Sequence, residues 1–156
     1  MQAIQKQELD LSGFIKIGVK YPDQVAKRVA VPLSVQSQCA SALVYDDREV
    51  RETPRLIEVY VQMMQHGLKV VETEIGNDRP FPFTESDMAI GNNSEDVLWI
   101  PSDMNDRIRD LFNLYNTHRQ ANGQKRLRSV VSIIVAMIRL GCRATPLKPV
   151  FDATCP

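Results

Sequence analysis

The sequence contains 156 residues, of which 44% are hydrophobic, and its 19 basic and 19 acidic side chains give a formal net charge of zero. This length fits one compact domain or two very small ones, and the apolar content is enough for a buried core. A membrane span is not expected, because Ser132 and Arg139 interrupt the longest apolar stretch, well short of the roughly 18 residues that a span needs. Residues 1–10 lack the basic and apolar regions of a secretory signal, so we expect a soluble, cytoplasmic protein without a membrane partner.

Charge is unevenly distributed along the chain. Residues 111–151 contain no Asp or Glu but many basic side chains, whereas residues 69–95 are strongly acidic. This asymmetry predicts one face that binds an anionic partner. The alternative is a basic surface that serves only solubility.

The first elements expected along the chain are an arm and a strand-helix-helix unit. Residues 1–25 are the predicted N-terminal arm, in which the alternating residues 14–19 form either an additional strand or an arm that pairs with a sheet edge. The unit covers residues 26–69, and Pro32 ends its strand. Beyond this proline, apolar residues recur at helical spacing at Val35, Cys39, Ala42 and Leu43.

The second helix of this unit has signals at both ends. Thr53 is a suitable N-cap and Pro54 a suitable first helical residue, and Gly67 suits the left-handed position after a helix. An apolar stripe between them predicts an amphipathic helix. Residues 70–94 contain glycines, asparagines and prolines and predict an extended linker.

Residues 95–143 repeat the pattern of the first unit. Segment 96–104 aligns with segment 27–35 without a gap, their prolines coincide, and Gly141 corresponds to Gly67. The β-branched residues 130–135 fit a buried strand on local evidence, but the alignment favours a helix.

The loop before that helix is basic and contains a turn signal at Asn122 and Gly123. Residues 144–156 form a predicted C-terminal tail.

Catalytic and metal-binding patterns are not recognisable in the sequence. The three cysteines, Cys39, Cys142 and Cys155, are far apart and include no C-x-x-C pair, so they predict neither a disulfide framework nor a zinc site, and two of them are expected in the core. Motifs typical of nucleotide-binding loops, serine hydrolases and zinc proteases are absent. We therefore expect a protein that is not an enzyme and uses no metal or cofactor.

A strand ended by proline, an amphipathic helix, a turn and a second, largely apolar helix resemble the layout of the ribbon-helix-helix DNA-binding proteins, such as the Arc and MetJ repressors. In that family two chains pair their strands into an antiparallel ribbon that enters the major groove, and the second helices share a core. The resemblance covers residues 26–68 and 95–143 and implies an α+β, mainly α domain. Its two strand-helix-helix repeats would pair about a pseudo-twofold axis, with a two-stranded antiparallel ribbon. A unit of this size is too small for a core of its own, which independently favours pairing within the chain. This tandem form resembles conjugation accessory proteins, including the TraY protein and the overdrive-binding protein of T-DNA transfer.

The resemblance also implies which residues contact DNA. Strand alternation places Ala26, Arg28 and Ala30, and on the other strand Glu95, Val97 and Trp99, on the outer face. Arg28 suits a guanine and Trp99 a thymine methyl or a sugar, and Glu95 would repel phosphates. A core or interface residue is an equal alternative for Trp99. The second helices would bind phosphates through free N–H groups at their N-terminal ends. The predicted contacts are Lys27, Arg28, Ala30, Thr53, Arg55, Val97, Trp99, Arg119, Lys125, Arg126, Arg128 and Ser129.

The function expected from this resemblance is that of a DNA-binding accessory protein of plasmid or T-DNA-type conjugative transfer. Its partners would be double-stranded DNA and a relaxase or other transfer proteins, and it would act as a monomeric pseudo-dimer or a weak homo-oligomer on DNA. Transcriptional repression, or plasmid partition or antitoxin-type regulation, would use the same physics. An adaptor that binds proteins and not DNA is the alternative of another class, and the salt dependence of DNA binding distinguishes the two.

Overall fold

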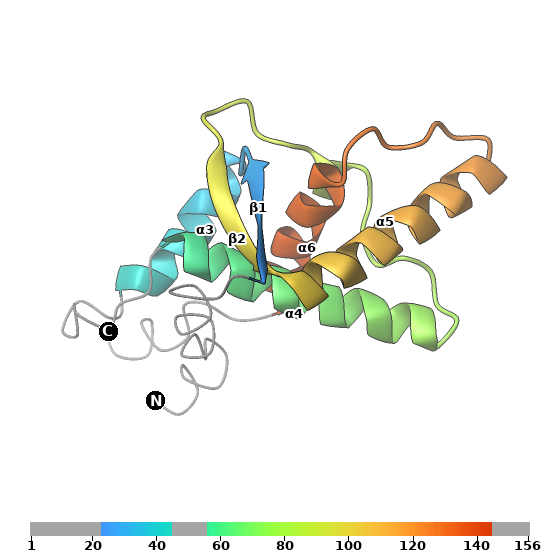
Figure 1. The fold of residues 1–156 in the computed structure, drawn as a ribbon, viewed down its shortest axis with the longest axis horizontal. Coiled ribbons are helices and arrows are strands. Elements are labelled where there is room, and N and C mark those ends of the chain that lie inside the picture. The colour runs from blue at the N-terminus through green and yellow to red at the C-terminus, as the bar shows by residue number, and fades with distance from the viewer. Residues whose placement is uncertain (1–22, 45–55, 145–156) are drawn as a thin grey trace.

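The computed structural model describes residues 23–44 and 56–144. The predicted strand at residues 14–19 and the C-terminal tail from residue 145 lie outside the described residues. The described elements, in chain order, are β1 (Gln24–Val29), α3 (Leu33–Val44), α4 (Leu56–Gly76), the short 3-10 helix η2 (Ser86–Met88), β2 (Asp96–Pro101), α5 (Ser102–Ala121) and α6 (Val131–Ala144). The expected α+β, mainly helical class is confirmed, with one two-stranded antiparallel sheet among these residues (Figure 1).

The sheet joins strands from the two halves of the chain. β1 and β2 run antiparallel, with Ala26 opposite Trp99 and Arg28 opposite Val97. Side chains alternate between the two faces of a strand, so one face of this ribbon is buried and the other points outward. The inward face contributes Val29, Leu98 and Ile100, each fully buried, to the core.

Each strand leads directly into a helix, as the two prolines predict. The Pro32 carbonyl accepts the amides of Val35 at 3.0 Å and Gln36 at 2.9 Å, so α3 begins immediately after the proline. α5 begins at Ser102 after Pro101, and the Ser102 amide donates to the Asp23 carbonyl at 2.8 Å. Proline suits these positions because it lacks the N–H that a helix start would leave unpaired.

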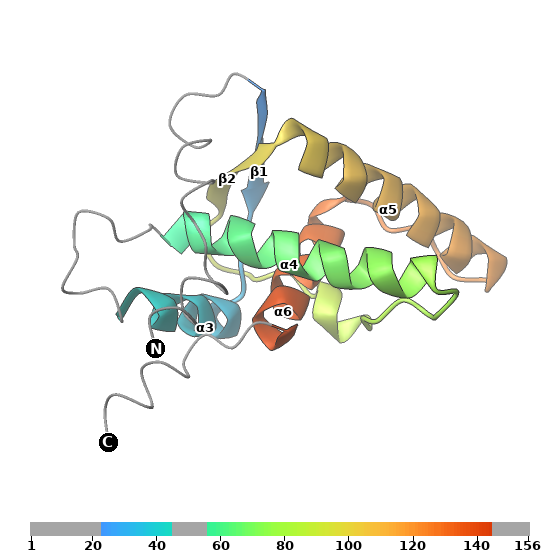
Figure 2. The same ribbon diagram turned by 90° about the horizontal axis from the view of Figure 1, so that it is seen from below.

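The most extensive packing between elements is that of α4 against α6. Figure 2 shows α4 crossing in front of α6, while α5 leads away from the ribbon. The β-branched segment 130–135 is helical from Val131 onward, so the alignment predicted its structure correctly and the local propensity did not. Fully buried side chains from both helices form the centre of the core, namely Tyr60, Met63, Met64, Leu68, Ile133, Ile134, Met137 and Ile138.

The prediction that Gly67 ends its helix is wrong. α4 continues to Gly76, and the left-handed residue after it is Asp78, with φ of 58°. The helix end is closed by the Asp78 amide, which donates to the Ile75 carbonyl at 3.0 Å, and by the Arg79 amide, which donates to the Glu74 carbonyl at 2.9 Å. The first part of the predicted linker is therefore helix.

Gly67 and Gly141 instead lie inside α4 and α6, where the two helices approach most closely. A Cβ added to Gly67 would stand 2.8 Å from the carbonyl carbon of Met137 and closer still to its oxygen. A Cβ added to Gly141 would stand 2.6 Å from the carbonyl carbon of Met63, again with the oxygen closer. Both glycines are therefore needed for helix packing, because any side chain would collide with the backbone of the other helix.

Candidate nucleic-acid interface

The outward face of the ribbon is formed by alternating residues of both strands. Ala26 and Arg28 are exposed, Val97 is half-buried, and Trp99 has 51% of its surface exposed. Trp99 is thus not a core residue, and the outward placement predicted from alternation is correct for these positions. Lys27 points to the other face and is half-buried, beside the exposed Arg28.

Ala30 was predicted on this face and does not lie there. β1 ends at Val29, and Ala30 is 7% exposed, with its carbonyl accepting the Gly91 amide at 2.8 Å. The strand ends before the alternation reaches Ala30, so the chain has already turned inward toward α3. Ala30 is therefore removed from the candidate interface.

Gln24 also lies on the outward face, although it is not among the predicted contacts. Gln24 pairs with Pro101 and lies two residues before Ala26, so it belongs to the same outward row. Its amide side chain suits the donor and acceptor pair of adenine in the major groove. The sequence contained the signal, because the alternation of residues 26, 28 and 30 can be extended back by one step, to residue 24.

The loop before α6 carries the exposed side chains Lys125, Arg126 and Arg128, which we call the basic loop. Its start is fixed by Gly123, which is left-handed with φ of 73°, in agreement with the predicted turn. Its centre is held by Asn116, whose Oδ1 accepts the Leu127 amide at 2.7 Å. The backbone is anchored and the basic side chains point to solvent. In Figure 1 both the basic loop and the ribbon lie above α4.

The N-terminal end of α6 is capped within the chain. Ser129 Oγ accepts the Val131 amide at 3.1 Å. The amides of Ser132 and Ile133 donate to the carbonyls of Ser129 at 3.3 Å and Val130 at 3.0 Å. These N–H groups are not free for a phosphate, which corrects the expectation for this helix end. Anion binding here would depend on the exposed basic loop and on the helix dipole.

Arg119 was predicted to contact DNA and instead has a structural role. It is 8% exposed, and its Nη1 lies 3.2 Å from Glu85 Oε2. Its Nε donates to the Lys125 carbonyl at 2.5 Å, and its guanidinium stacks over the Tyr115 ring at 5.9 Å from the centroid. Arg119 therefore holds the basic loop in place and is removed from the candidate interface.

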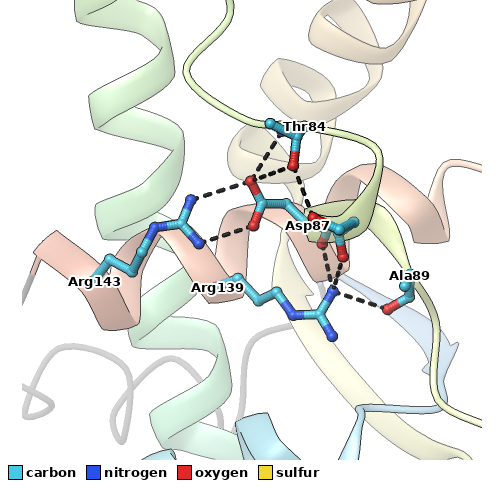
Figure 3. A network of polar contacts seen from close by, with 6 residues as sticks. Thr84, Asp87, Ala89, Arg139 and Arg143 are labelled. Carbon is cyan, nitrogen blue, oxygen red and sulfur yellow. Dashed lines mark hydrogen bonds and ion pairs between the residues drawn. The ribbon is translucent and has the colours of Figure 1, made fainter.

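The charge asymmetry of the sequence is largely used inside the molecule. The acidic linker lies against α6, where Asp87 pairs with Arg143 at 2.8 Å. Arg139 Nη1 donates to the carbonyls of Ser86, Asp87 and Ala89 at 2.7, 2.9 and 3.1 Å (Figure 3). These contacts correct the expectation of an extended linker, and they show that Arg139 and Arg143 bind within the chain. Four Lys and Arg side chains of residues 111–144 are exposed. One is Arg143, which pairs with Asp87, and the other three form the basic loop.

Thr53 and Arg55, the predicted phosphate contacts of the first unit, lie outside the described residues. Within the described residues, no group of three or more His, Cys, Asp or Glu side chains is placed to hold a metal ion. None of the helices described is long and apolar enough to cross a membrane.

Comparison with known proteins adds no assignment to this geometry. Neither the family models nor the curated proteins and solved structures compared with the chain gave a match. The ribbon face and the basic loop are therefore the features from which a function can be inferred.

Replacing Asp87 by asparagine is expected to lower the free energy of unfolding by about 1 kcal/mol, because the ion pair with half-exposed Arg143 is lost. Burial raises the pKa of Asp87, but hydrogen bonds from Arg143 and Thr84 outweigh it, so the pKa lies below its ordinary value. A lowered folded-state pKa stabilises the protein above the unfolded-state value, about 3.9, and this contribution is lost as the pH falls through the folded-state value. Urea unfolding at neutral and acidic pH measures it. A difference between parent and Asp87→Asn that does not shrink in acid would contradict this role.

Proposed function

We propose that this protein binds double-stranded DNA as a single-chain ribbon-helix-helix domain, with the outward face of the β1–β2 ribbon in the major groove. The observation that carries the proposal is the antiparallel ribbon between the two halves of the chain, with Arg28 and Trp99 exposed on one face. The major groove is wide enough for a two-stranded ribbon. On that face Arg28 would bind a guanine, and Trp99 would contact a thymine methyl or a sugar.

Two sets of contacts support a pseudo-twofold arrangement. Arg28 and Val97 hold the same position in the aligned segments 27–35 and 96–104, and they are directly paired in the ribbon. A twofold axis between two repeats requires such pairing of equivalent residues.

The crossing of the second helices supports the same arrangement. Gly67 approaches Met137, and Gly141 approaches Met63, with each methionine one helical turn before the glycine of its own helix. If Gly67 corresponds to Gly141, then Met63 corresponds to Met137. Rotation about the pseudo-twofold axis then converts the Gly67–Met137 contact into the Gly141–Met63 contact. Reciprocity of this kind is what an isologous pairing of repeats produces.

Phosphate binding would come from the basic loop. Its three side chains precede α6 and add to the partial positive charge of that helix end. Each cation that neutralises a phosphate releases counterions, so affinity falls with salt. The role as an accessory protein of conjugative transfer is the narrower part of the proposal. It depends on the tandem resemblance alone, and repression, partition or antitoxin-type regulation remain alternative roles for the same interface.

The second candidate function is a protein–protein adaptor. It is favoured by the composition of the ribbon, where Trp99, Ala26 and Val97 are apolar and exposed Glu95 stands just before β2. Aromatic residues and arginine are common at protein interfaces, so the face also fits a protein partner.

Fluorescence anisotropy of labelled duplex DNA across a salt series tests the proposal. We expect binding at low salt that weakens steeply, with a slope of about −0.9 in log K against log salt for each neutralised phosphate. A pool of mixed-sequence duplexes is the first probe, and selection of a preferred site follows if it binds. Absence of binding by the folded protein at low salt would reject the DNA-binding proposal and favour the adaptor.

A further inference from the structure

Cys39 of α3 and Cys142 of α6 meet in the core, although they lie 103 positions apart in the sequence. Their Sγ atoms are 3.5 Å apart and form a hydrogen bond. Cys39 is fully buried and Cys142 is 5% exposed. Each thiol belongs to a different half of the chain, so their contact crosses the main packing boundary of the fold.

The two thiols are not equivalent. The hydrogen bond with Cys39 lowers the pKa of Cys142, burial opposes this, and the neighbouring Arg143 lowers it further, so the net pKa lies below its ordinary value. The hydrogen bond with Cys142 and burial both raise the pKa of Cys39. Cys142 is also the more exposed of the two residues, so we expect its thiol to react first.

We propose that Cys39 and Cys142 are a reversible redox pair, which a peroxide oxidises to a disulfide that locks α3 of the first half onto α6 of the second half. The sulfur atoms are already in contact. A disulfide requires about 2.05 Å, so they approach each other by about 1.5 Å. In a reducing compartment the pair stays as two thiols, and oxidative stress converts it to the disulfide.

The reaction balances with one peroxide for one disulfide. The Cys142 thiolate attacks one peroxide oxygen, the O–O bond breaks and a hydroxide leaves, which takes a proton to become water and leaves Cys142 as the sulfenic acid. The Cys39 sulfur then attacks the Cys142 sulfur, the S–O bond breaks, and the second oxygen leaves as water with the proton of Cys39. Two thiols are oxidised by two electrons, and the peroxide is reduced to two waters.

The disulfide would act mainly on the stability of the domain. It closes a long loop that includes α4, β2, α5 and most of α6, so the unfolded chain loses much conformational freedom. We expect the midpoint of thermal unfolding, Tm, to rise by roughly 5 °C or more after oxidation and to return after treatment with dithiothreitol.

The test uses the full chain with Cys155→Ser, so that Cys39 and Cys142 are its only thiols. The folded protein is treated with hydrogen peroxide and examined by intact mass, peptide mapping under non-reducing conditions and thermal unfolding. The expected result is the loss of two hydrogen atoms, a linked peptide that contains Cys39 and Cys142, and a Tm increase that dithiothreitol reverses. The inference does not depend on DNA binding.

The matched control is the same chain with Cys39→Ser as well. Peroxide should then add oxygen to Cys142 without a cross-link. Peroxide should also give no Tm increase of the kind that dithiothreitol reverses in the Cys155→Ser protein. The proposal is overturned if the folded Cys155→Ser protein keeps both thiols free, gains oxygen without a cross-link, or forms the cross-link with no change in Tm.

Discussion

Replacing Gly67 by alanine is expected to lower the free energy of unfolding by at least about 3 kcal/mol. The new methyl group would collide with the backbone carbonyl of Met137, which is part of α6 and cannot turn aside as a side chain does. Relief would require α4 and α6 to separate, and this opens the most extensive packing in the core. Gly141→Ala would meet the carbonyl of Met63 in the same way, so a similar loss is expected. Urea unfolding followed by far-UV circular dichroism measures both.

Gly76 provides the matched control for this prediction. It ends the same helix, and a Cβ added there meets nothing within 4 Å. Gly76→Ala should therefore leave stability unchanged or raise it by up to about 1 kcal/mol, because alanine favours the helix. Equal effects of Gly67→Ala and Gly76→Ala would mean that helix propensity, and not the helix crossing, determines the role of Gly67.

The combined Lys125→Ala, Arg126→Ala and Arg128→Ala variant is expected to bind duplex DNA roughly tenfold more weakly, or worse, at 0.1 M salt. These side chains are exposed and the backbone that carries them is anchored by Asn116 and Arg119, so their loss should leave the fold intact. If all three neutralise phosphates, the slope of log K against log salt becomes shallower by about 2.7. Anisotropy titrations of parent and variant over the same salt series measure both quantities.

A variant with the same change in net charge at other positions is the control. The exposed side chains of Lys69 on α4, Arg79 just after α4 and Arg109 on α5 belong neither to the ribbon strands nor to the basic loop. Their replacement by alanine should reduce affinity far less than the loss of the basic loop. Similar losses of affinity in the two variants would mean that DNA binding depends only on the overall charge of the protein. The basic loop would then have no specific part in binding.

Much of the fold follows from local signals in the sequence. Pro32 and Pro101 mark the change from strand to helix, and the apolar stripes identify the helices that follow. Alternation also predicts the exposure of Arg28 and Trp99, because the register of a half-buried ribbon is set by which residues face the core. The aligned repeat corrects the local β propensity of residues 130–135, which arises because residues 133–138 of α6 are all buried and are apolar on every side.

What the sequence predicted wrongly depends on contacts between distant segments. A glycine after an apolar stripe is the signal both for a helix end and for a close helix crossing, so Gly67 was misread. In the sequence Arg119 resembles any other residue of the basic stretch before α6. In the structure it lies on α5, in contact with Glu85 of the linker, the Lys125 carbonyl and the Tyr115 ring. The pairing of Asp87 with Arg143 likewise joins segments whose opposite charges were visible but whose contact was not.

The most direct test of the account is the accessibility of Trp99 to acrylamide with and without duplex DNA. It is the only tryptophan in the sequence and 51% of its surface is exposed on the ribbon, so its fluorescence reports on that face without any label. At low salt and saturating duplex, we expect acrylamide to quench Trp99 much less than in the free protein, and addition of salt to restore the quenching as anisotropy reports release of the DNA. Unchanged quenching at saturation would place the DNA elsewhere on the protein and contradict the central claim that this ribbon is the DNA-binding surface.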